Sequence, residues 1–315
     1  MVQAVRDAFG QALVEVGREN PNVVVLDADL ATSTRVHYFA QAFPERFFQM
    51  GIAEQNMMGV AAGMALSGKI PFVSTFAVFS SRRACDQVAL CVSHCRANVK
   101  ILGAYAGIMS GNNGASHQAV EDLAIMRAIP GIVVLDPADD VEMAQVVRAI
   151  VEYQGPVYLR VTRDVWPRVS PEGYQFRIGK AVQVRDGRDV TLVGTGVMTS
   201  QCVAAAEILA QERVAARVLH MPTVKPVDVE TLVRAARETK GLVTAENHTI
   251  YGGLGSAVAE VLVEHAPAPM VRVGLEDCYG ACGTNEELLR QYRLSPQDIV
   301  EAARSVLDHA DRRRR

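Results

Sequence analysis

Residues 131–162 read GIVVLDPADDVEMAQVVRAIVEYQGPVYLRVT and show the pattern that decides the fold. Two short apolar runs, 131–136 and 157–162, flank a segment near 139–152 that we expect to be a helix. Both runs are continuous and contain several β-branched residues, which is typical of strands covered by helices on both faces. The stretch therefore indicates a mostly parallel sheet in an α/β fold.

The same alternation continues on both sides of this stretch. The first half predicts further strands at 23–29, 71–76 and 99–105, with helices over 53–66, over 79–93 and from about 118. The second half predicts strands at 189–196, 216–221, 241–247 and 270–275, with helices near 199–212, 227–238 and 254–265. Between the halves the rhythm is broken by prolines, scattered charges and turn residues. We therefore predict two open α/β domains, over 1–165 and 188–315, joined by a linker over 166–187.

Bulk composition bounds the class of protein. A chain of 315 residues that is 49% apolar and 21% charged has globular composition and the length of about two domains. Its net charge of −3 gives no reason to expect a nucleic acid or an anionic membrane as a partner. Residues 1–20 indicate an amphipathic helix and not a secretory signal, and no apolar run reaches the ~20 residues of a membrane span. We expect a soluble, cytoplasmic protein.

The cysteines and the basic end of the chain do not indicate function. Six cysteines in a chain of this size do not suggest a disulfide framework. The pairs Cys91/Cys95 and Cys278/Cys282 have C-x3-C spacing without paired histidines, so no metal site is expected there. The four arginines 312–315 are expected to form a solvated chain end, and their role stays open.

The stretch Phe47–Gly63, FFQMGIAEQNMMGVAAG, carries one acidic residue, Glu54, at the start of an apolar helix of small residues. A carboxylate in such surroundings must take up a proton or find a partner. A carboxyl group in a dry crevice suits general acid–base chemistry. The alternative is a first-turn carboxylate that the helix dipole stabilises.

Four segments with polar or aromatic side chains follow strands of the first half. They are DADLATST (27–34), the flanks of Glu54, TFAVFSSRR (75–83) and GIMSGNNGASHQ (107–118). Because ligands of open α/β sheets bind beyond the carboxyl ends of the strands, these segments mark a candidate site. Each also has a structural alternative: Asp29 as a turn residue, Phe76 and Phe79 as core, and His117 as a helix start.

Together these residues resemble the pyrimidine-binding domain of the transketolase family of thiamine diphosphate enzymes. The second half is similar to the family's C-terminal domain, chiefly in VTAENHTIYGGLGSAVAEVL (243–262) and VGLEDCYGACGTNEELLRQYRLSPQDIV (273–300). The resemblance covers essentially the whole chain, in spacing as well as in residue type. It implies a pyrimidine-binding fold followed by a transketolase C-terminal-domain fold.

The resemblance implies cofactor contacts for four residues. Glu54 would be the catalytic glutamate that contacts the aminopyrimidine ring of thiamine diphosphate. Phe76 and Phe79 would stack on that ring, and Asp29 would approach the cofactor near the thiazolium. In this picture the protein supplies a tuned acid while the cofactor supplies the electron sink.

The resemblance also implies substrate contacts, which are Arg6, Ser33, Tyr105, Asn113, His117 and Arg163. His117, in SHQAVEDLA (116–124), matches the family's active-site histidine and is expected to bond substrate hydroxyls or shuttle protons. Transketolases carry an aspartate where this chain has Asn113 and a histidine where it has Tyr105. The donor ketose and the acceptor aldose therefore stay open, as does whether they are phosphorylated.

One half of the cofactor site is missing from the sequence. The family's G-D-G signature, followed about 25–30 residues later by an asparagine, binds the diphosphate and Mg²⁺, and this chain lacks it. The similar string RDGRD (185–189) precedes a strand and has no downstream asparagine. We therefore expect a separate N-terminal subunit that supplies the Mg²⁺ ligands, in an α2β2 assembly that is active only when both chains are present.

The leading interpretation is the C-terminal (beta) subunit of a two-chain transketolase that moves a two-carbon ketol unit from a ketose to an aldose. Within the same chemistry, the alternatives are a 1-deoxyxylulose-5-phosphate-synthase-like enzyme and a 2-oxo acid dehydrogenase beta subunit. A non-catalytic regulatory paralogue is the alternative from another class. Glu246 and His248, which end a strand of the second half, are further candidates for a site or for loop anchors.

Overall fold

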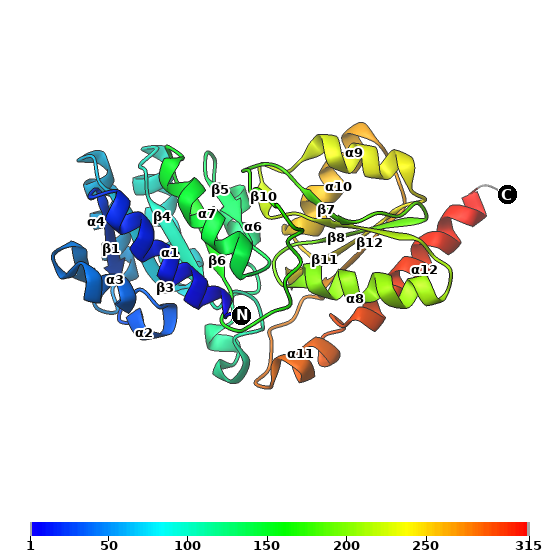
Figure 1. Cartoon of the computed structure of the whole chain (residues 1–315), viewed down its shortest axis with the longest axis horizontal. Coiled ribbons are helices and arrows are strands. Elements are labelled where there is room, and N and C mark those ends of the chain that lie inside the picture. The colour runs from blue at the N-terminus through cyan, green and yellow to red at the C-terminus, as the bar shows by residue number, and fades with distance from the viewer. Residues whose placement is uncertain (1, 314–315) are drawn as a thin grey trace.

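The chain folds into two sheets that lie side by side, each flanked by helices (Figure 1). The computed structural model describes residues 2–313, so Arg314 and Arg315 of the basic end lie outside the described residues. Within that range no helix combines the length and the apolar composition that a membrane span requires. The predicted fold class, two open α/β domains, is confirmed.

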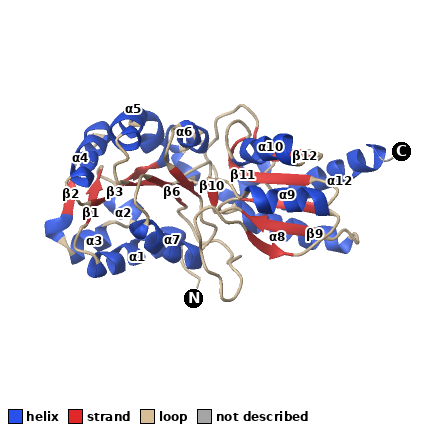
Figure 2. Cartoon of the chain, turned by 90° about the horizontal axis from the view of Figure 1, so that it is seen from above, coloured by secondary structure: helices blue, strands red, loops and turns tan. Residues whose placement is uncertain are grey.

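The first sheet has the strand order β10-β5-β6-β4-β3-β1-β2 and is parallel except for β10. Its strands are β1 (Val23–Asp27), β2 (Phe47–Gln49), β3 (Ile70–Phe76), β4 (Lys100–Ala104), β5 (Val133–Leu135), β6 (Val157–Val161) and β10 (Thr223–Lys225). One face carries α1 (Val5–Glu19), α3 (His37–Ala42) and α7 (Asp140–Glu152), and the other carries α4 (Glu54–Leu66), α5 (Cys85–Gln87) and α6 (Asp122–Ala128) (Figure 2). The short α2 (Ala31–Thr34) follows β1.

The second sheet has the order β12-β11-β8-β9-β7, in which only β7 is antiparallel. Its strands are β7 (Val182–Arg185), β8 (Val190–Gly194), β9 (Ala216–His220), β11 (Leu242–Thr249) and β12 (Met270–Leu275). The helices are α8 (Met198–Gln211), α9 (Val229–Glu238), α10 (Leu254–His265), α11 (Asn285–Gln291) and α12 (Pro296–Arg313). α8 and α12 share one apolar cluster against this sheet, and α9 and α10 share another.

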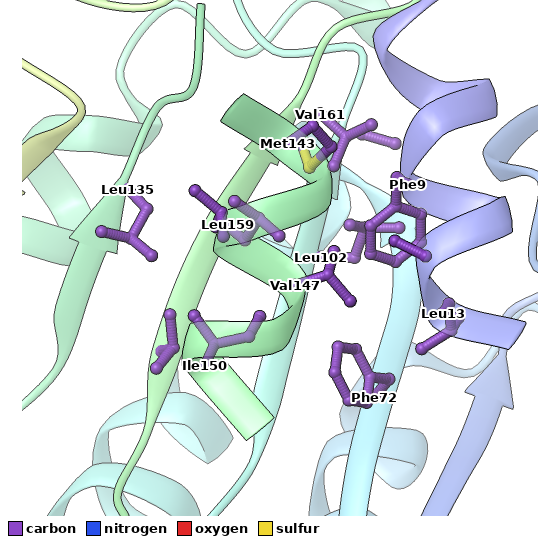
Figure 3. Packing of buried hydrophobic residues seen from close by; sticks show 14 of the residues in the cluster. Phe9, Leu13, Phe72, Leu102, Leu135, Met143, Val147, Ile150, Leu159 and Val161 are labelled. Atoms are coloured by element: carbon purple, nitrogen blue, oxygen red, sulfur yellow. The ribbon is translucent and has the colours of Figure 1, made fainter. Parts of the chain in front are cut away.

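The core of the first domain explains why its strands are continuous apolar runs. Phe9 and Leu13 of α1 and Val147 of α7 pack over Phe72 and Leu102 of the central strands (Figure 3). α4 and α6 bury a second cluster on the opposite face, so every residue of β1, β3, β4, β5 and β6 is buried. Burying a side chain of this size contributes about 1.5–3 kcal/mol.

Several elements differ from the sequence prediction. The helix expected over 79–93 is divided into a π-helical turn η2 (Phe79–Arg83), α5, and a second π-helical segment η3 (Val88–His94). The helix expected from about 118 begins at Asp122, because residues 111–117 form two short 3₁₀ turns, η4 (Gly111–Asn113) and η5 (Ala115–His117). These irregular segments border the candidate site.

The two halves of the chain are also more closely joined than expected. β7 lies within the predicted linker, where it adds an edge strand to the second sheet by antiparallel pairing with β9. β10 comes from the second half of the chain and yet pairs with β5 of the first sheet. The domain boundaries drawn from the sequence stay predictions.

Candidate active site

A pocket of about 480 Å³ opens at the carboxyl ends of the first sheet. Its lining comes from loops and strand ends that follow β1, β3, β4 and β6, as expected for a ligand site in an open α/β sheet. The lining residues are Leu30, Ser33, Phe76, Tyr105, Asn113, His117 and Arg163. All of these except Leu30 are residues that the sequence analysis selected.

Three stacked aromatic rings lie at the pocket, of which Phe76 and Tyr105 line it. The Phe76 ring stacks on the Tyr105 ring at 4.4 Å between centroids and on the Phe79 ring at 6.1 Å. The His117 ring meets both phenylalanine rings edge-on, at 6.0 Å from Phe76 and 5.6 Å from Phe79. Phe76 is buried and belongs to the core cluster of the first domain. It is therefore a core residue, as the structural alternative expects, and a pocket residue as well.

Two arginines surround Tyr105. Arg6 donates one hydrogen bond to the Tyr105 hydroxyl and another, of 3.2 Å, to the Ser33 carbonyl oxygen. The Tyr105 hydroxyl donates in turn to the same carbonyl at 3.2 Å. Arg163 lies over the Tyr105 ring, with Cζ 5.5 Å from the centroid. Tyr105 therefore brings Arg6, Ser33 and Arg163 together at one side of the pocket.

Glu54 lies in the first turn of α4, as the helix-dipole alternative expects, but the helix has no side-chain capping hydrogen bond at this end. The Glu54 side chain is 1% exposed, and both carboxylate oxygens accept hydrogen bonds of 2.9 Å from Nη1 of Arg83. The Arg83 guanidinium also lies over the Phe79 ring, with Cζ 4.4 Å from its centroid. Arg83 thus connects the buried acid to the aromatic set, and it is a residue that the sequence analysis did not select.

Asp29 is not one of the residues that line the pocket. It is exposed and has a positive φ of 62°, in the left-handed region that aspartate tolerates better than most residues. Its backbone N–H donates to Oε1 of Gln49 at 3.0 Å. Its chain neighbour Leu30 lines the pocket, whereas Asp29 does not. The turn interpretation of Asp29 therefore fits the geometry, and its contact with a cofactor stays a prediction.

The loop that carries Asn113 and His117 is held by the second domain. Nε2 of the buried Gln118 donates to the Ile108 carbonyl at 3.1 Å and to the Ala281 carbonyl at 3.0 Å. His117 ends a 3₁₀ turn and does not start an α-helix, and its Nδ1 lies 2.9 Å from the Ser116 hydroxyl. The loop is therefore positioned by contacts across the domain interface, which the sequence pattern does not report.

The residues present fit one half of thiamine diphosphate. Stacked phenylalanine rings and a buried carboxylate, joined here through Arg83, are the groups that an aminopyrimidine ring needs, since it presents a flat face and a polar edge. No group of three or more His, Cys, Asp or Glu among the described residues could hold a metal ion. The RDGRD string contains the turn after β7, where Asp186 accepts a hydrogen bond from the Gly187 N–H.

Glu246 and His248 are anchors inside the second domain. Both side chains are fully buried, and Glu246 accepts hydrogen bonds of 2.7 and 2.8 Å from the backbone N–H groups of Leu254 and Gly255, which begin α10. Burial raises the pKa of Glu246 to about 7 and lowers that of His248 to about 4. A Cβ on Gly253 would lie 1.9 Å from a Glu246 oxygen, so this glycine allows close packing.

Two open α/β sheets, with an acid and stacked aromatic rings at the strand ends of the first, define a two-domain α/β protein with a cofactor-type site. Residues 2–168 match the family model "Transketolase, pyrimidine binding domain", and residues 179–299 match "Transketolase, C-terminal domain". The chain belongs to the transketolase family, whose enzymes depend on thiamine diphosphate.

Two relatives of similar length are named as transketolase subunits. The chain is 43% identical to the 6-deoxy-6-sulfo-D-fructose transketolase subunit of Clostridium sp. (strain MSTE9), over 96% of this chain and 94% of the relative. It is 36% identical to one of the subunits of the apulose-4-phosphate transketolase of Phocaeicola vulgatus, over 95% and 96% of the two chains. A solved structure described as a split gene transketolase, inactive beta4 tetramer, matches with a TM-score of 0.91 and 48% identity over 98% of this chain and 99% of that one.

Proposed function

We propose that this chain is the C-terminal (beta) subunit of a two-chain, thiamine diphosphate-dependent transketolase. It would transfer a two-carbon ketol unit from a ketose or ketose phosphate to an aldose or aldose phosphate. The observation that carries the proposal is the pocket at the strand ends, where Phe76, Tyr105 and His117 meet and where Phe79 leads through Arg83 to the buried carboxylate of Glu54.

The cofactor side of the site would be formed by Glu54, Phe76 and Phe79. The cofactor, when bound, supplies an acidic ring carbon and an electron sink for breaking the bond beside a ketose carbonyl. Glu54 would contact the pyrimidine ring nitrogen from the start of α4, where its carboxyl group is buried. Phe76 and Phe79 would hold the ring by stacking and exclude water from it. Asp29 would approach the cofactor from the loop after β1.

The substrate side would be formed by the residues around Tyr105. Arg163 and Arg6 carry planar guanidinium groups that match the oxygens of a sugar phosphate. Tyr105 and Ser33 hold Arg6 in place by hydrogen bonds. His117 and Asn113 line the same pocket, where they would bond sugar hydroxyls, and His117 could also move a proton.

A partner subunit is the second part of the proposal. The described residues contain neither a metal-binding cluster nor the family's diphosphate signature, so Mg²⁺ and the diphosphate would be held by an N-terminal transketolase subunit. The similar solved structure, described as an inactive beta4 tetramer, supports a beta chain that is inactive on its own. We propose an α2β2 assembly with the cofactor between the chains.

The alternatives have less support. Two relatives that match this chain over more than nine-tenths of both lengths are named as transketolase subunits, which favours a transketolase over a synthase or a dehydrogenase subunit. A non-catalytic paralogue would have no need of a buried acid that is linked through Arg83 to stacked rings at a pocket.

Reconstitution tests the proposal. The purified chain is mixed with the N-terminal transketolase subunit encoded in the same genome, and binding of thiamine diphosphate with Mg²⁺ is measured by calorimetry for each chain and for the mixture. Transfer from a panel of ketoses and ketose phosphates is assayed in parallel. We expect binding and transfer only in the mixture, and loss of nearly all turnover in Glu54→Ala. Full activity of the isolated chain would contradict the two-chain architecture, and full activity of Glu54→Ala would contradict the assigned site.

A further inference from the structure

We propose that Arg83 competes with the cofactor's pyrimidine ring for Glu54 and Phe79. Its guanidinium contacts both groups in this structure and would leave them when the cofactor binds. The inference rests on the proposed function, because it takes Glu54 and Phe79 as the groups that receive the ring. In this proposal Arg83 and the pyrimidine ring compete for the same two side chains, whereas the arginine of a purely structural salt bridge would stay in place.

The geometry gives Arg83 both contacts that the ring would make. Its Nη1 donates to the two carboxylate oxygens of Glu54 at 2.9 Å each, and its guanidinium lies 4.4 Å above the centroid of Phe79. A guanidinium is flat, carries N–H donors on its edge and stacks on aromatic rings. A protonated aminopyrimidine has the same three properties. Glu54 therefore contacts the planar donor Arg83 in this structure and would contact another planar donor when the cofactor is bound.

The physical need for a partner follows from the burial of Glu54. With 1% of its side chain exposed at the start of α4, an unpartnered carboxylate would destabilise the chain before it meets cofactor. Asymmetry within the pair makes the exchange feasible, because the Arg83 side chain is 47% exposed. Its guanidinium can turn into water without burying an unpaired charge, whereas Glu54 stays in place.

The local backbone places Arg83 where it can do this. Phe79 and Arg83 are the first and last residues of the π-helical turn η2. Such turns are rare in proteins, and those that occur are often found at functional sites. The neighbouring Arg82 points elsewhere and pairs with Glu121, with Nη2 to Oε2 at 2.9 Å. Arg82 is therefore a matched control: an adjacent arginine with a carboxylate partner of its own, which makes no contact with Glu54 among the described residues.

Cofactor affinity is the first measurement. Calorimetry with thiamine diphosphate and Mg²⁺ is performed on the complex with the N-terminal subunit, using wild type, Arg83→Met, Arg82→Met and Glu54→Gln. Because Arg83 competes with the ring, we expect Arg83→Met to lower the Kd by about 5- to 30-fold, the worth of a half-exposed ion pair together with a cation–π contact. Arg82→Met should leave the Kd within about twofold, and Glu54→Gln should raise it.

Stability of the isolated chain is the second measurement. Arg83→Met leaves the Glu54 carboxylate without a partner, so its Tm should fall by about 2–4 °C. The same substitution in a Glu54→Gln background should have almost no effect, because no buried charge remains to be paired. Arg83→Gln, which keeps a neutral donor, has the same expected direction in affinity and serves if the methionine variant does not fold.

The outcomes separate the two proposals. An unchanged or higher Kd in the Arg83 variants, with Glu54→Gln weakened, would overturn the competing role and make Arg83 a holder of the cofactor or a plain structural partner. An unchanged Kd in Glu54→Gln would instead remove the assigned cofactor contact, and the proposed function with it. A lower Kd in Arg83→Met, with the control unchanged, would support both.

Discussion

The side chain of Asn247, in the second domain, holds the backbone of Ile108 at the start of the loop that carries His117. Its Oδ1 accepts a 2.9 Å hydrogen bond from the Ile108 N–H, and its Nδ2 donates to the Ala106 carbonyl at 3.2 Å. Gly107 lies between these groups with a φ of +71°, and a Cβ there would come 2.2 Å from the amide. One asparagine therefore replaces the backbone partners that this sharp bend lacks.

We expect Asn247→Ala to loosen the pocket as well as the fold. The Ile108 N–H and the Ala106 carbonyl would lose their buried partners, so the free energy of unfolding should fall by about 1–3 kcal/mol. Because His117 and Asn113 are carried by the same loop, KM for the sugar substrate should rise more than kcat falls. Urea denaturation and steady-state kinetics of the reconstituted complex measure both. Asn20→Ala, which removes one exposed local hydrogen bond to the Asn22 N–H, is the control, and an equal effect there would contradict this role.

Arg160 is expected to be a major determinant of stability at the domain interface. Its Nε donates to Oδ2 of Asp122 at 2.8 Å, and its Nη1 donates to Asp136 and to the Asn247 carbonyl at 3.3 Å each. Burial acts to raise the pKa of Asp122, but the Arg160 guanidinium holds it below its usual range. Removing one partner of such a pair leaves a buried charge, so Arg160→Met should lower the free energy of unfolding by about 3–5 kcal/mol.

The matched control for Arg160 is Arg148 on α7. It pairs with Glu15 at 2.7 Å and Glu19 at 2.9 Å, but all three side chains are largely exposed. Exposed pairs contribute about 0–1 kcal/mol, so Arg148→Met should change the free energy of unfolding little. Denaturant titration of both variants decides the matter. Similar losses in the two would show that burial of the Arg160 network contributes nothing extra.

Local patterns were sufficient for the buried central strands and for the residues at their ends, but not for the edge strands β2, β7 and β10. Continuous apolar runs predict parallel strands, and the carboxyl ends of such strands converge, which is why Phe76, Tyr105 and Arg163 reach one pocket. No local sequence pattern predicts a contact between residues that are far apart in the chain. Arg83 and Glu54 are 29 positions apart, and their pairing depends on a π-helical turn that periodicity does not reveal.

Contacts across the domain interface could not be predicted from the sequence either. Asn247 and Ile108 are separated by 139 positions, and β10 joins the first sheet from the second half of the chain. Each depends on how two finished domains dock, which is a property of their surfaces and not of a local repeat. The sequence could indicate that 107–118 belongs to the site, but not that the second domain positions it.

The buried Glu246 and His248 should give the chain opposite pH dependences that nearly cancel. Their nearest polar atoms are 3.6 Å apart, and burial raises the pKa of Glu246 to about 7 and lowers that of His248 to about 4. Between the unfolded value of 4.5 and about 7, the folded chain keeps a proton on Glu246, so this group makes stability fall as pH rises. Between about 4 and 6.5, only the unfolded chain protonates His248, so this group makes stability rise with pH.

In Glu246→Gln, the contribution of His248 to the pH dependence of stability should therefore no longer be cancelled. Relative to wild type, the variant should gain stability as pH rises from about 4.5 to 7, with a difference slope approaching about 1.4 kcal/mol per pH unit. His248→Gln should show a difference of the opposite sign, losing stability relative to wild type as pH rises from about 4 to 6.5. Urea denaturation at half-unit pH steps measures these differences, in which the other titrating groups cancel. Parallel curves for all three proteins would mean that neither group shifts on folding.

Arg163 tests whether the substrate carries a phosphate. Its side chain lines the pocket and is 37% exposed, with the guanidinium over the Tyr105 ring and Nε 3.9 Å from Asp164, so it can bind an anion from the pocket side. A charged hydrogen bond contributes about 1.5–3 kcal/mol, so Arg163→Ala should lower kcat/KM for phosphorylated sugars by about 10- to 150-fold. For the free sugars the loss should stay below about threefold. Assays of the reconstituted complex with both classes of sugar supply the comparison, and Arg234→Ala, on the exposed face of α9, is the control. Equal losses with both classes would assign Arg163 to the fold of the pocket and not to a phosphate.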